Sequence, residues 1–571
     1  MHDAALPSVC PAIHRIARTH RWTAAFLFFF LWFTVSPLHA QFETASVLGY
    51  VHDTTGAAVP SGKVQLINTA TGVAVTATTD SQGQYQFSDI HIGQYKISAS
   101  ANGFSSTVTE PFSVAVNARQ RVDVNLKPGS VGETVTVSGV AAQLESETSD
   151  TGTVISQREV LNLPLNGRAY GDLATLVPGV RRNVLENQTV TSRDASFNVN
   201  GQRSEFNNFL LDGVDNNAYG TSNQGFSNQA IPPSPDAINE FRVETNNYSA
   251  EYGRASGAVI NVSINSGTNQ FHGSVWEYNR NTDLNAEGPF LPPLNVLTGQ
   301  RQIPVLIRNQ FGGAVGGPIK KDKLFFFADF EGNRQVQGQY TTATIPNVQQ
   351  RAGIFVDTTG APVPLVNPIT GKVYPNGVVP QSDWTPLAKL VIAALPAPNV
   401  PNSFSNNYAS LPKASLTDNK GDGRVDYYLS PKTTIFGRFS NHHGDIVDAS
   451  SIPGLAGGGG NGTIHAYNKQ VVGGATHTFN QSSILDARIG FTWTLGGKTP
   501  YLAGVTSLNT QAGIPGLPTD PTVIRALSSE NVTGFTSWGA QNSNPQFQNP
   551  FVIDPKVNYS ILKGRDSIKV G

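Results

Sequence analysis

The sequence predicts a mainly β protein: an N-terminal β-sandwich, an α+β domain, and then an incomplete antiparallel transmembrane β-barrel. Of the 571 residues, 56 are glycine and only 14% are charged, a composition typical of many short strands and turns. Apolar residues recur at every second position in many short runs, as they do in half-buried strands. In the second half, short turns alternate with long stretches rich in Pro, Gly and Asn, which is the pattern of membrane barrels.

Residues 1–40 have the three parts of a secretory signal peptide. Arg15, Arg18 and Arg21 precede an apolar run over residues 24–35, and a short segment ending at Ala40 supplies a cleavage site. The run is shorter than the roughly 20 residues that a bilayer-spanning helix needs, so a membrane anchor is the weaker alternative. The only cysteine, Cys10, would leave with the signal. The mature chain would then form no disulfide and no cysteine-based zinc site.

Residues 41–128 are predicted to form an antiparallel sandwich. Val64 and Leu66 alternate with polar neighbours, as do Tyr85 and Phe87, so each pair places apolar side chains on one face of a strand. Residues 129–150 are polar and are predicted to be an extended linker. This linker contains one short β-type run, formed by Glu133, Thr134, Val135, Thr136 and Val137.

Residues 151–266 are predicted to form the α+β domain. A Pro-Leu-Asn-Gly break separates two short helices, and β-type runs follow at residues 197–202, 209–216, 241–245 and 258–267. Asp212 and Asp215 lie close enough in sequence to suggest a cation site. Asp-Gly after an apolar run instead favours a tight turn in which Asp and Asn side chains bond backbone groups, and we prefer this interpretation.

Residues 267–571 alternate in the manner of membrane strands. Leu485, Ile489 and Phe491 share one face, whereas Asp486 and Arg488 share the other. One face therefore suits lipid and the other suits water. The same alternation would also fit a soluble sandwich, in which the apolar face meets a second sheet.

The connections in this part differ in length. Short turns at 320–323 and 430–432 alternate with long stretches at 335–417 and 496–565, as expected of a barrel with long loops on one side. We count roughly eight or nine strands after Thr268. An open sheet edge is unstable in hydrocarbon, so we expect this chain to be the N-terminal part of a longer protein with a closed barrel.

Charge and motifs exclude several functions. With 39 Lys and Arg against 40 Asp and Glu, the chain has no basic field for a nucleic-acid partner. Residues 457–462 match G-x-G-x-x-G and residues 418–423 resemble the start of a calcium loop, but both lack the required neighbours. We predict a flexible loop and a turn entering a strand, respectively, and a solvated surface pair at His442 and His443. The sequence contains no recognisable set of catalytic residues. We therefore predict that the protein is not an enzyme and has no metal site and no cofactor.

Three segments carry a family resemblance. They are LPLNGRAYGDLATLVPGV (163–180), FNVNGQRSEFNNFLLDGVDN (197–216) and DAINEFRVETNNYSAEYGRASGAVINVSINSGTNQFHG (236–273). They resemble the plug domain and the first barrel strand of TonB-dependent outer-membrane receptors, specifically the Oar-like group with an N-terminal carboxypeptidase-regulatory-like domain. The resemblance implies an outer-membrane protein in which residues 151–266 fill the lumen of the barrel.

The resemblance also implies partners and site residues. The run over residues 133–137 resembles a TonB box, a strand that would pair with the sheet edge of a TonB-type periplasmic energy-coupling protein; an ordinary edge strand is the alternative. The other implied partners are outer-membrane lipid and an unknown extracellular ligand, for which an oligosaccharide or a peptide is possible. The implied plug landmarks are Leu163, Pro164, Asn166, Gly167, Asn200, Gly201, Arg203, Asp212, Gly213 and Asp215.

We therefore expect a TonB-dependent receptor or transporter in the outer membrane, energised by an inner-membrane partner. The alternative function is a surface carbohydrate-binding or adhesion protein that uses the N-terminal sandwich. A secreted carboxypeptidase is a third class, which the missing zinc-binding histidine motif disfavours.

Overall fold

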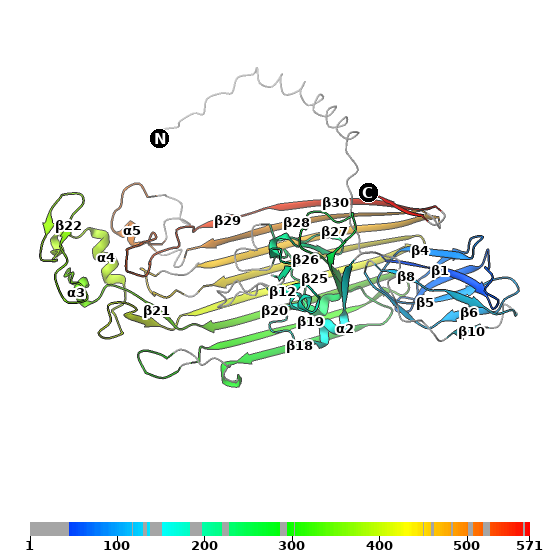
Figure 1. Cartoon of the computed structure of the whole chain (residues 1–571), viewed down its shortest axis with the longest axis horizontal. Helices are drawn as coiled ribbons and strands as arrows, with labels where there is room; N and C mark the ends of the chain where they lie inside the picture. Colours follow the sequence, from blue (N-terminus) through cyan, green and yellow to red (C-terminus); the bar gives the residue numbers. More distant parts are fainter. Residues whose placement is uncertain are drawn as a thin grey trace, which may run out of the picture.

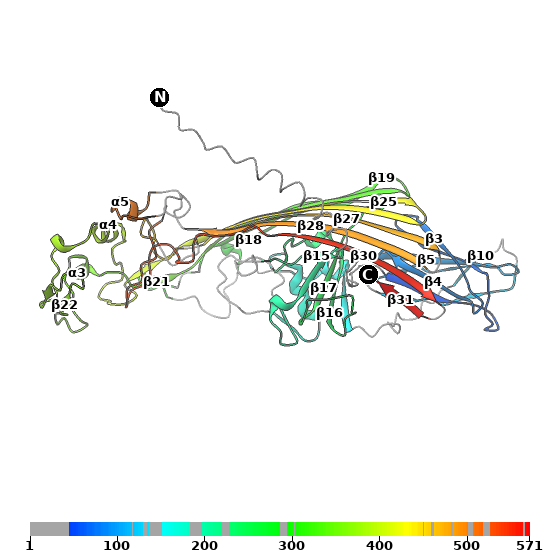
Figure 2. The same cartoon turned by 90° about the horizontal axis from the view of Figure 1, so that it is seen from above.

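The chain folds into three parts, which we call the sandwich, the central domain and the large sheet (Figure 1). Figure 2 shows the large sheet as a curved layer, with the central domain against its concave face and the sandwich at one end. The predicted order of sandwich, α+β domain and large antiparallel sheet is confirmed. The computed structural model describes residues 45–116, 118–129, 134–137, 151–182, 197–219, 228–285, 294–301, 303–448, 450–457, 462–480, 483–500, 506–517, 526–563 and 566–571. The predicted signal peptide lies outside these described residues.

The sandwich consists of two sheets around one apolar core. One sheet has the order β4-β1-β8, with β9 also paired to β1: β1 (Ala45–Asp53), β4 (Gln84–Ile90), β8 (Arg119–Arg121) and β9 (Val124–Leu126). The other has the order β10-β6-β5-β2-β3, with β7 on β5: β2 (Lys63–Asn68), β3 (Ala74–Thr78), β5 (Gly93–Ser100), β6 (Ser106–Thr109), β7 (Phe112–Val114) and β10 (Thr134–Val137). Val64, Leu66, Tyr85 and Phe87 are all buried between the sheets, so the predicted core face is confirmed.

The central domain is built on a five-stranded sheet of order β11-β16-β17-β14-β15. Its strands are β11 (Thr151–Ser156), β14 (Asn208–Leu211), β15 (Val214–Asp215), β16 (Ile238–Asn246) and β17 (Val259–Ile264). The remaining elements are α2 (Gln157–Asn162), η1 (Tyr170–Leu176), β12 (Val180–Arg182), β13 (Phe197–Val199), η2 (Ser204–Phe206) and η4 (Pro235–Ala237). Helix α2 begins at a capping box, in which the Ser156 N–H donates to the Glu159 carboxylate at 2.7 Å. Alternate residues of β16, such as Phe241 and Val243, enter the apolar core under η1.

The large sheet has ten strands in the described part of the chain, against the eight or nine predicted. They are β18 (His272–Asn281), β19 (Leu306–Lys320), β20 (Leu324–Gly338), β25 (Lys413–Ser430), β26 (Thr433–Val447), β27 (Thr463–Asn480), β28 (Ser483–Thr499), β29 (Gln546–Gln548), β30 (Phe551–Lys563) and β31 (Asp566–Val570). Neighbouring strands are antiparallel. The outer-face residues Ile489 and Phe491 are exposed, as predicted, whereas Asp486 and Arg488 on the inner face are buried and not in water. The inner face meets the central domain.

Several local predictions in the large sheet are wrong. Residues 418–423 do not form a turn, because they lie in the middle of β25. His442 is buried in β26 and bonds the Asp418 carboxylate at 2.8 Å, so it is not a solvated residue. The predicted loop over 496–565 contains β30, which pairs with β28 along its length although it includes Pro555. In residues 418–423 and in β30, pairing with neighbouring strands overrides the local turn preference of Asp, Gly and Pro.

The long loops fold into a small unit of their own at the end of the sheet opposite the sandwich (Figure 1). Its elements are β21 (Thr341–Ala343), α3 (Val348–Arg351), β22 (Leu365–Val366), β23 (Val373–Tyr374), η6 (Gln381–Asp383), α4 (Pro386–Ala394), β24 (Tyr408–Ser410) and α5 (Leu508–Gln511), and η5 (Thr282–Leu284) follows β18. Ile345 and Val391, from the connection between β20 and β25, share one apolar core with Leu508 and Trp538, from the connection between β28 and β29. In the described part of the chain, no helix has the length and apolarity to span a membrane.

Candidate functional site

The contact between the central domain and the large sheet is the candidate functional site. Its first half is the turn after α2, which projects onto β18 and β19. The Asn166 side-chain oxygen accepts hydrogen bonds from Arg280 Nη1 and Arg308 Nη1, both at 3.0 Å. The Gly167 carbonyl accepts one from Gln310 Nε2 at 3.0 Å. Gly167 has a φ of 86°, a backbone conformation that glycine adopts without strain.

Arg168 completes this half of the site. Its Nε lies 2.7 Å from Glu331 of β20, and its Nη2 bonds Asp236 of the central domain. The guanidinium also lies over the rings of Trp276 and Tyr278, at 4.7 and 5.2 Å from their centroids. Carboxylates from both parts and two aromatic faces from the large sheet therefore hold one cation.

The second half of the site is the Asp212–Asp215 turn, which points into the inner face of β25 and β26. Asp212 is buried, with one side-chain oxygen 2.9 Å from Arg424 Nη1 and the other 2.6 Å from Arg438 Nε. The first oxygen also accepts the Ile264 N–H at 3.0 Å. A single carboxylate of the central domain is thus held between two arginines of the large sheet.

The backbone of the same turn is bonded by further side chains of the sheet. Four donors bond its carbonyl oxygens: Arg438 to Leu211 at 3.2 Å, Arg488 to Asp212 at 2.9 Å, Lys556 to Gly213 at 2.8 Å and Gln470 to Asp215 at 2.9 Å. The Asp215 N–H in turn donates to Asp554 at 2.8 Å. The predicted tight turn is present, and its acidic residues pair with protein cations and backbone groups.

The remaining predicted landmarks do not join this contact. Leu163 and Pro164 are exposed residues between α2 and the first turn. Asn200 forms a turn with Gly201 on the central domain's own surface and donates to the Thr245 carbonyl at 3.1 Å. Arg203 is exposed beside this turn. The structure therefore brings residues 166–168 and 212–215 to the large sheet, but not residues 200–203.

Sequence reasoning missed the arginines that hold the second turn. Arg424, Arg438 and Arg488 lie on three different strands but on the same inner face. A cation at an inward position of a strand is itself a signal, because an inward charge needs a partner. The sequence did not indicate which partner, because Asp212 is more than 200 positions from Arg424 and Arg438.

The predicted partner-binding run lies on the sandwich. Residues Thr134–Val137 form β10, which pairs in parallel with β6 from Thr134 opposite Ser106 to Val137 opposite Thr109. Glu133 and most of the linker lie outside the described residues. The run is therefore an edge strand, paired on one side.

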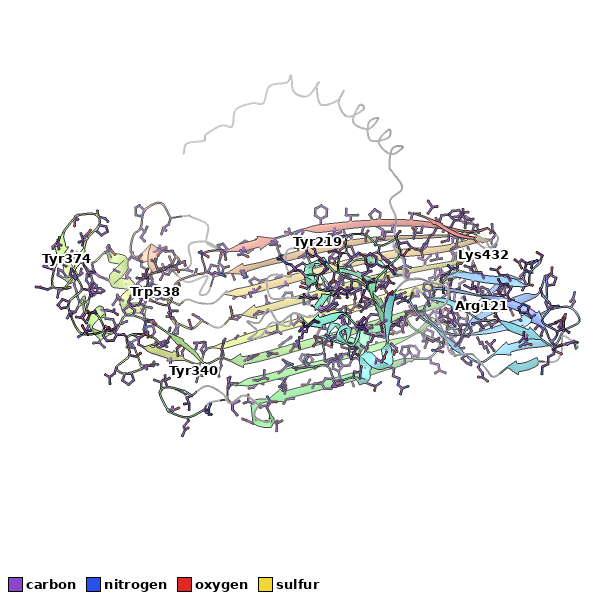
Figure 3. The ribbon with its side chains drawn as sticks, viewed as in Figure 1. Arg121, Tyr219, Tyr340, Tyr374, Lys432 and Trp538 are labelled. Carbon is purple, nitrogen blue, oxygen red and sulfur yellow. The ribbon has the colours of Figure 1, made fainter. Side chains whose placement is uncertain are left out.

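The sandwich is fixed to both other parts. The Asn269 side chain donates to the Thr71 carbonyl at 2.7 Å and accepts the N–H of Asp322, in the short turn 320–323, at 2.8 Å. On the central domain, Glu240 of β16 accepts the Val116 N–H. In Figure 3, Arg121 of the sandwich and Lys432 of a short turn lie at one end, whereas Tyr374 and Trp538 of the long loops lie at the other. The sandwich is thus at the short-turn end.

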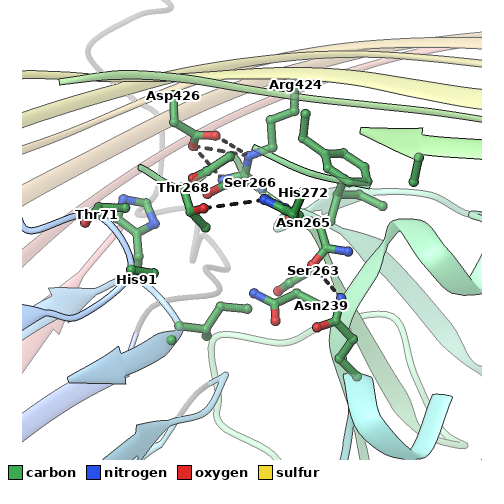
Figure 4. Close-up of a pocket in the computed structure, with 18 of the residues that line it drawn as sticks. Thr71, His91, Asn239, Ser263, Asn265, Ser266, Thr268, His272, Arg424 and Asp426 are labelled. Atoms are coloured by element: carbon green, nitrogen blue, oxygen red, sulfur yellow. Dashed lines mark hydrogen bonds and ion pairs between the residues drawn. The ribbon is translucent and has the colours of Figure 1, made fainter. Parts of the chain in front are cut away.

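A cavity of about 630 Å³ lies where the three parts meet (Figure 4). The sandwich contributes Thr71 and His91, the segment after β17 contributes Asn265 and Thr268, and β25 contributes Arg424. Its polar lining consists mainly of hydroxyl and amide groups, and burial lowers the pKa of His91. Among the described residues, no group of three His, Cys, Asp or Glu side chains is placed to hold a metal ion.

Comparison with known families gives three matches along the chain. Residues 46–127 match the carboxypeptidase regulatory-like domain. Residues 145–259 match the TonB-dependent receptor plug domain. Residues 263–571, more than half of the chain, match the outer membrane beta barrel domain.

Individual proteins are also similar. The chain is 29% identical over 264 residues to the TonB-dependent transporter Oar of Myxococcus xanthus, a match that covers 45% of this chain and 23% of that protein. Among solved structures, the outer membrane transporter YddB of Escherichia coli matches with a TM-score of 0.45 and 10% identity, covering 73% of this chain and 47% of YddB. The siderophore receptor PirA of Acinetobacter baumannii matches with a TM-score of 0.36 and 15% identity, covering 72% and 48%. The chain thus spans about a quarter of the curated relative and about half of these two solved chains.

Proposed function

The chain belongs to the TonB-dependent outer-membrane receptors, a family of receptors and transporters and not of enzymes, and we propose that it imports an extracellular ligand. In this proposal the large sheet is part of the barrel wall and the central domain is the plug that blocks the lumen. A TonB-type periplasmic protein binds residues 133–137 and supplies the energy. The chain itself uses no cofactor.

The contact between the Asp212–Asp215 turn and the large sheet supports this proposal most directly. It consists mainly of ion pairs and hydrogen bonds to the turn's backbone. Its apolar part is small: Val214 of the turn packs against Phe436 and Val472 of the large sheet. Polar interfaces between domains permit relative movement, whereas large apolar ones do not. A plug must stay closed at rest and yet separate from the wall when pulled. The polar contact of residues 212–215 with the large sheet, which we call the latch, meets both requirements.

The two ends of the sheet support an assignment of sides. The long loops form a unit with its own core at one end, and the short turns lie with the sandwich at the other. In membrane barrels the short turns face the periplasm and the long loops face outward, and the exposed outer-face residues Val425, Ile489 and Phe491 suit contact with lipid. We place the ligand site at the long-loop end, where an oligosaccharide or a peptide is the proposed ligand class. The periplasmic placement of the sandwich does not favour a surface-adhesion role.

Deleting residues 133–137 from the native protein tests the proposal. The deletion should abolish binding of the purified periplasmic domain of the organism's TonB-type protein, measured by surface plasmon resonance on the detergent-solubilised receptor. Deleting residues 141–145 is the matched control, because it shortens the same linker equally and leaves the run intact. Equal partner binding by both deletion variants would remove the docking assignment.

A further inference from the structure

The outer edge of β6 has the properties of a strand-binding site. Strand β6 is anchored in the sandwich by contacts that do not involve β10. The Thr107 side chain is buried, and its hydroxyl donates to the Asn125 carbonyl of β9 at 3.3 Å. The Thr109 hydroxyl accepts the Ile97 N–H of β5 at 2.9 Å. The edge of β6 is therefore held in place whether or not a further strand covers it.

Strand β10 is the weaker member of this pair. It is four residues long and is joined to β6 by a parallel ladder, a pairing slightly less stable per residue than an antiparallel one. In the sheet order it is the terminal strand beside β6 (Figure 1). An edge strand is paired on one side only and presents unpaired N–H and C=O groups to a further strand, so fewer bonds hold β10 than hold an interior strand.

The position of the sandwich determines what pulling on β10 would do. Hydrogen bonds from Asn269 to the sandwich and from Val116 to Glu240 fix the sandwich to the wall and the plug. While β10 remains paired with β6, a force on it acts on the sandwich and its anchors. Only a released β10 transmits force along residues 138–150 to β11, the edge strand of the plug sheet.

We propose that the edge of β6 is a strand-binding site whose resting occupant is β10, and that the sandwich and the TonB-type partner compete for these four residues. This inference rests on the proposed function, because it takes residues 133–137 as the partner's docking segment. The partner binds β10 by exchange with β6 and not by extending the sandwich sheet. The apparent affinity for the partner is then the intrinsic affinity multiplied by the fraction of molecules in which β10 is released from β6.

A disulfide lock tests the competition. Val108 and Thr136 are opposite each other in the ladder, and the chain has a single native cysteine, Cys10. In the native receptor, the oxidised Val108→Cys/Thr136→Cys variant should bind the partner's periplasmic domain at least about tenfold more weakly than the same protein after reduction. The reduced protein is the matched control. Equal or tighter binding in the oxidised form would overturn the exchange and favour sheet extension.

Hydrogen exchange of the unmodified protein tests the resting state separately. The paired amides of residues 134–137 should exchange more slowly than their intrinsic rates in an unstructured chain, and adding the partner domain should expose the edge of β6 to exchange. Exchange of all four residues at their intrinsic rates would show that β10 does not occupy the edge of β6. The inference would then fail even if the disulfide does not form. Partner binding that survives deletion of residues 133–137 would instead refute the proposed function, so the two failures are distinguishable.

Discussion

Replacing Asp212 with Asn is the most direct test of the latch between plug and wall. Asn has nearly the same shape, and its side-chain oxygen can still accept the Ile264 N–H, which now bonds Asp212 at 3.0 Å. The substitution removes the negative charge and places an NH2 donor where the second carboxylate oxygen faces Arg438. Arg424 and Arg438, 2.9 and 2.6 Å from the carboxylate, then remain buried without this anion.

The expected magnitude follows from the partners that each arginine keeps. Removing one member of a buried ion pair costs roughly 3–5 kcal/mol. Arg424 still has Asp426 at 2.9 Å, and Arg438 still has Asp422 at 3.6 Å, so the cost should lie near the lower bound. A loss of about 3 kcal/mol corresponds to roughly a hundredfold change in the equilibrium between the docked and released turn.

The Asp215 amide provides the assay. Its N–H donates across the interface to Asp554 at 2.8 Å, so its exchange with deuterium reports release of the turn from the wall. We expect roughly hundredfold faster exchange at this amide in Asp212→Asn. Asp172→Asn is the control, because Asp172 faces only the exposed Arg182 at 3.7 Å. Unchanged protection of Asp215 in Asp212→Asn would refute the reasoning.

A double mutant separates charge imbalance from simple loss of contact. In Asp212→Asn with Arg438→Gln, one of the two unbalanced cations is removed together with the anion. The double variant should therefore be less destabilised than the sum of the two single variants, by roughly 1–3 kcal/mol. Additive effects would show that the buried charges are not coupled.

Two further predictions concern the plug. Burial raises the pKa of Glu240 from 4.5 to about 7, although the Val116 N–H favours the charged form. The sandwich–plug contact should therefore weaken as pH rises from about 4.5 to about 7, by up to roughly 3 kcal/mol, and change little above that. Protection of the Val116 amide, corrected for the intrinsic pH dependence of exchange, should fall between pH 5 and pH 8 in the native protein but not in Glu240→Gln. A Cβ at Gly267 would lie 2.4 Å from the Phe326 carbonyl oxygen, so Gly267→Ala should lower the free energy of unfolding by roughly 1–3 kcal/mol, which is seen as a lower urea midpoint. Gly253→Ala, where a Cβ meets nothing within 4 Å, should leave the midpoint unchanged.

Some of the architecture follows from short-range sequence patterns. Val64 and Leu66 are separated by one residue, and that spacing alone places both on the core face of β2. The short turns at 320–323 and 430–432 likewise follow from local composition, and each joins two neighbouring strands of the large sheet. The family resemblance also came from contiguous segments. These features depend on residues a few positions apart, so they can be predicted from local sequence.

Local composition failed where neighbouring strands supplied the decisive contacts. Residues 418–423 are rich in Asp and Gly, which favour turns, yet they lie between β20 and β26 and pair with both. The long loop predicted over residues 496–565 includes Pro555, but β30 pairs there with β28 on one side and, near its end, with β31 on the other. A strand's partners lie elsewhere in the chain, so its own residues do not show how strongly it will be held.

The candidate site was decided by the tertiary structure alone. The sequence identified the Asp212–Asp215 turn but could not show that Arg424, Arg438 and Arg488 surround it. Nor could it show that β10 occupies the edge of β6. Alternation fixes which face of a strand a side chain occupies, but the meeting of two faces depends on sheet order, register and curvature. Those are set by the packing of the whole chain, and so the sequence determined the elements while only their assembly determined the latch.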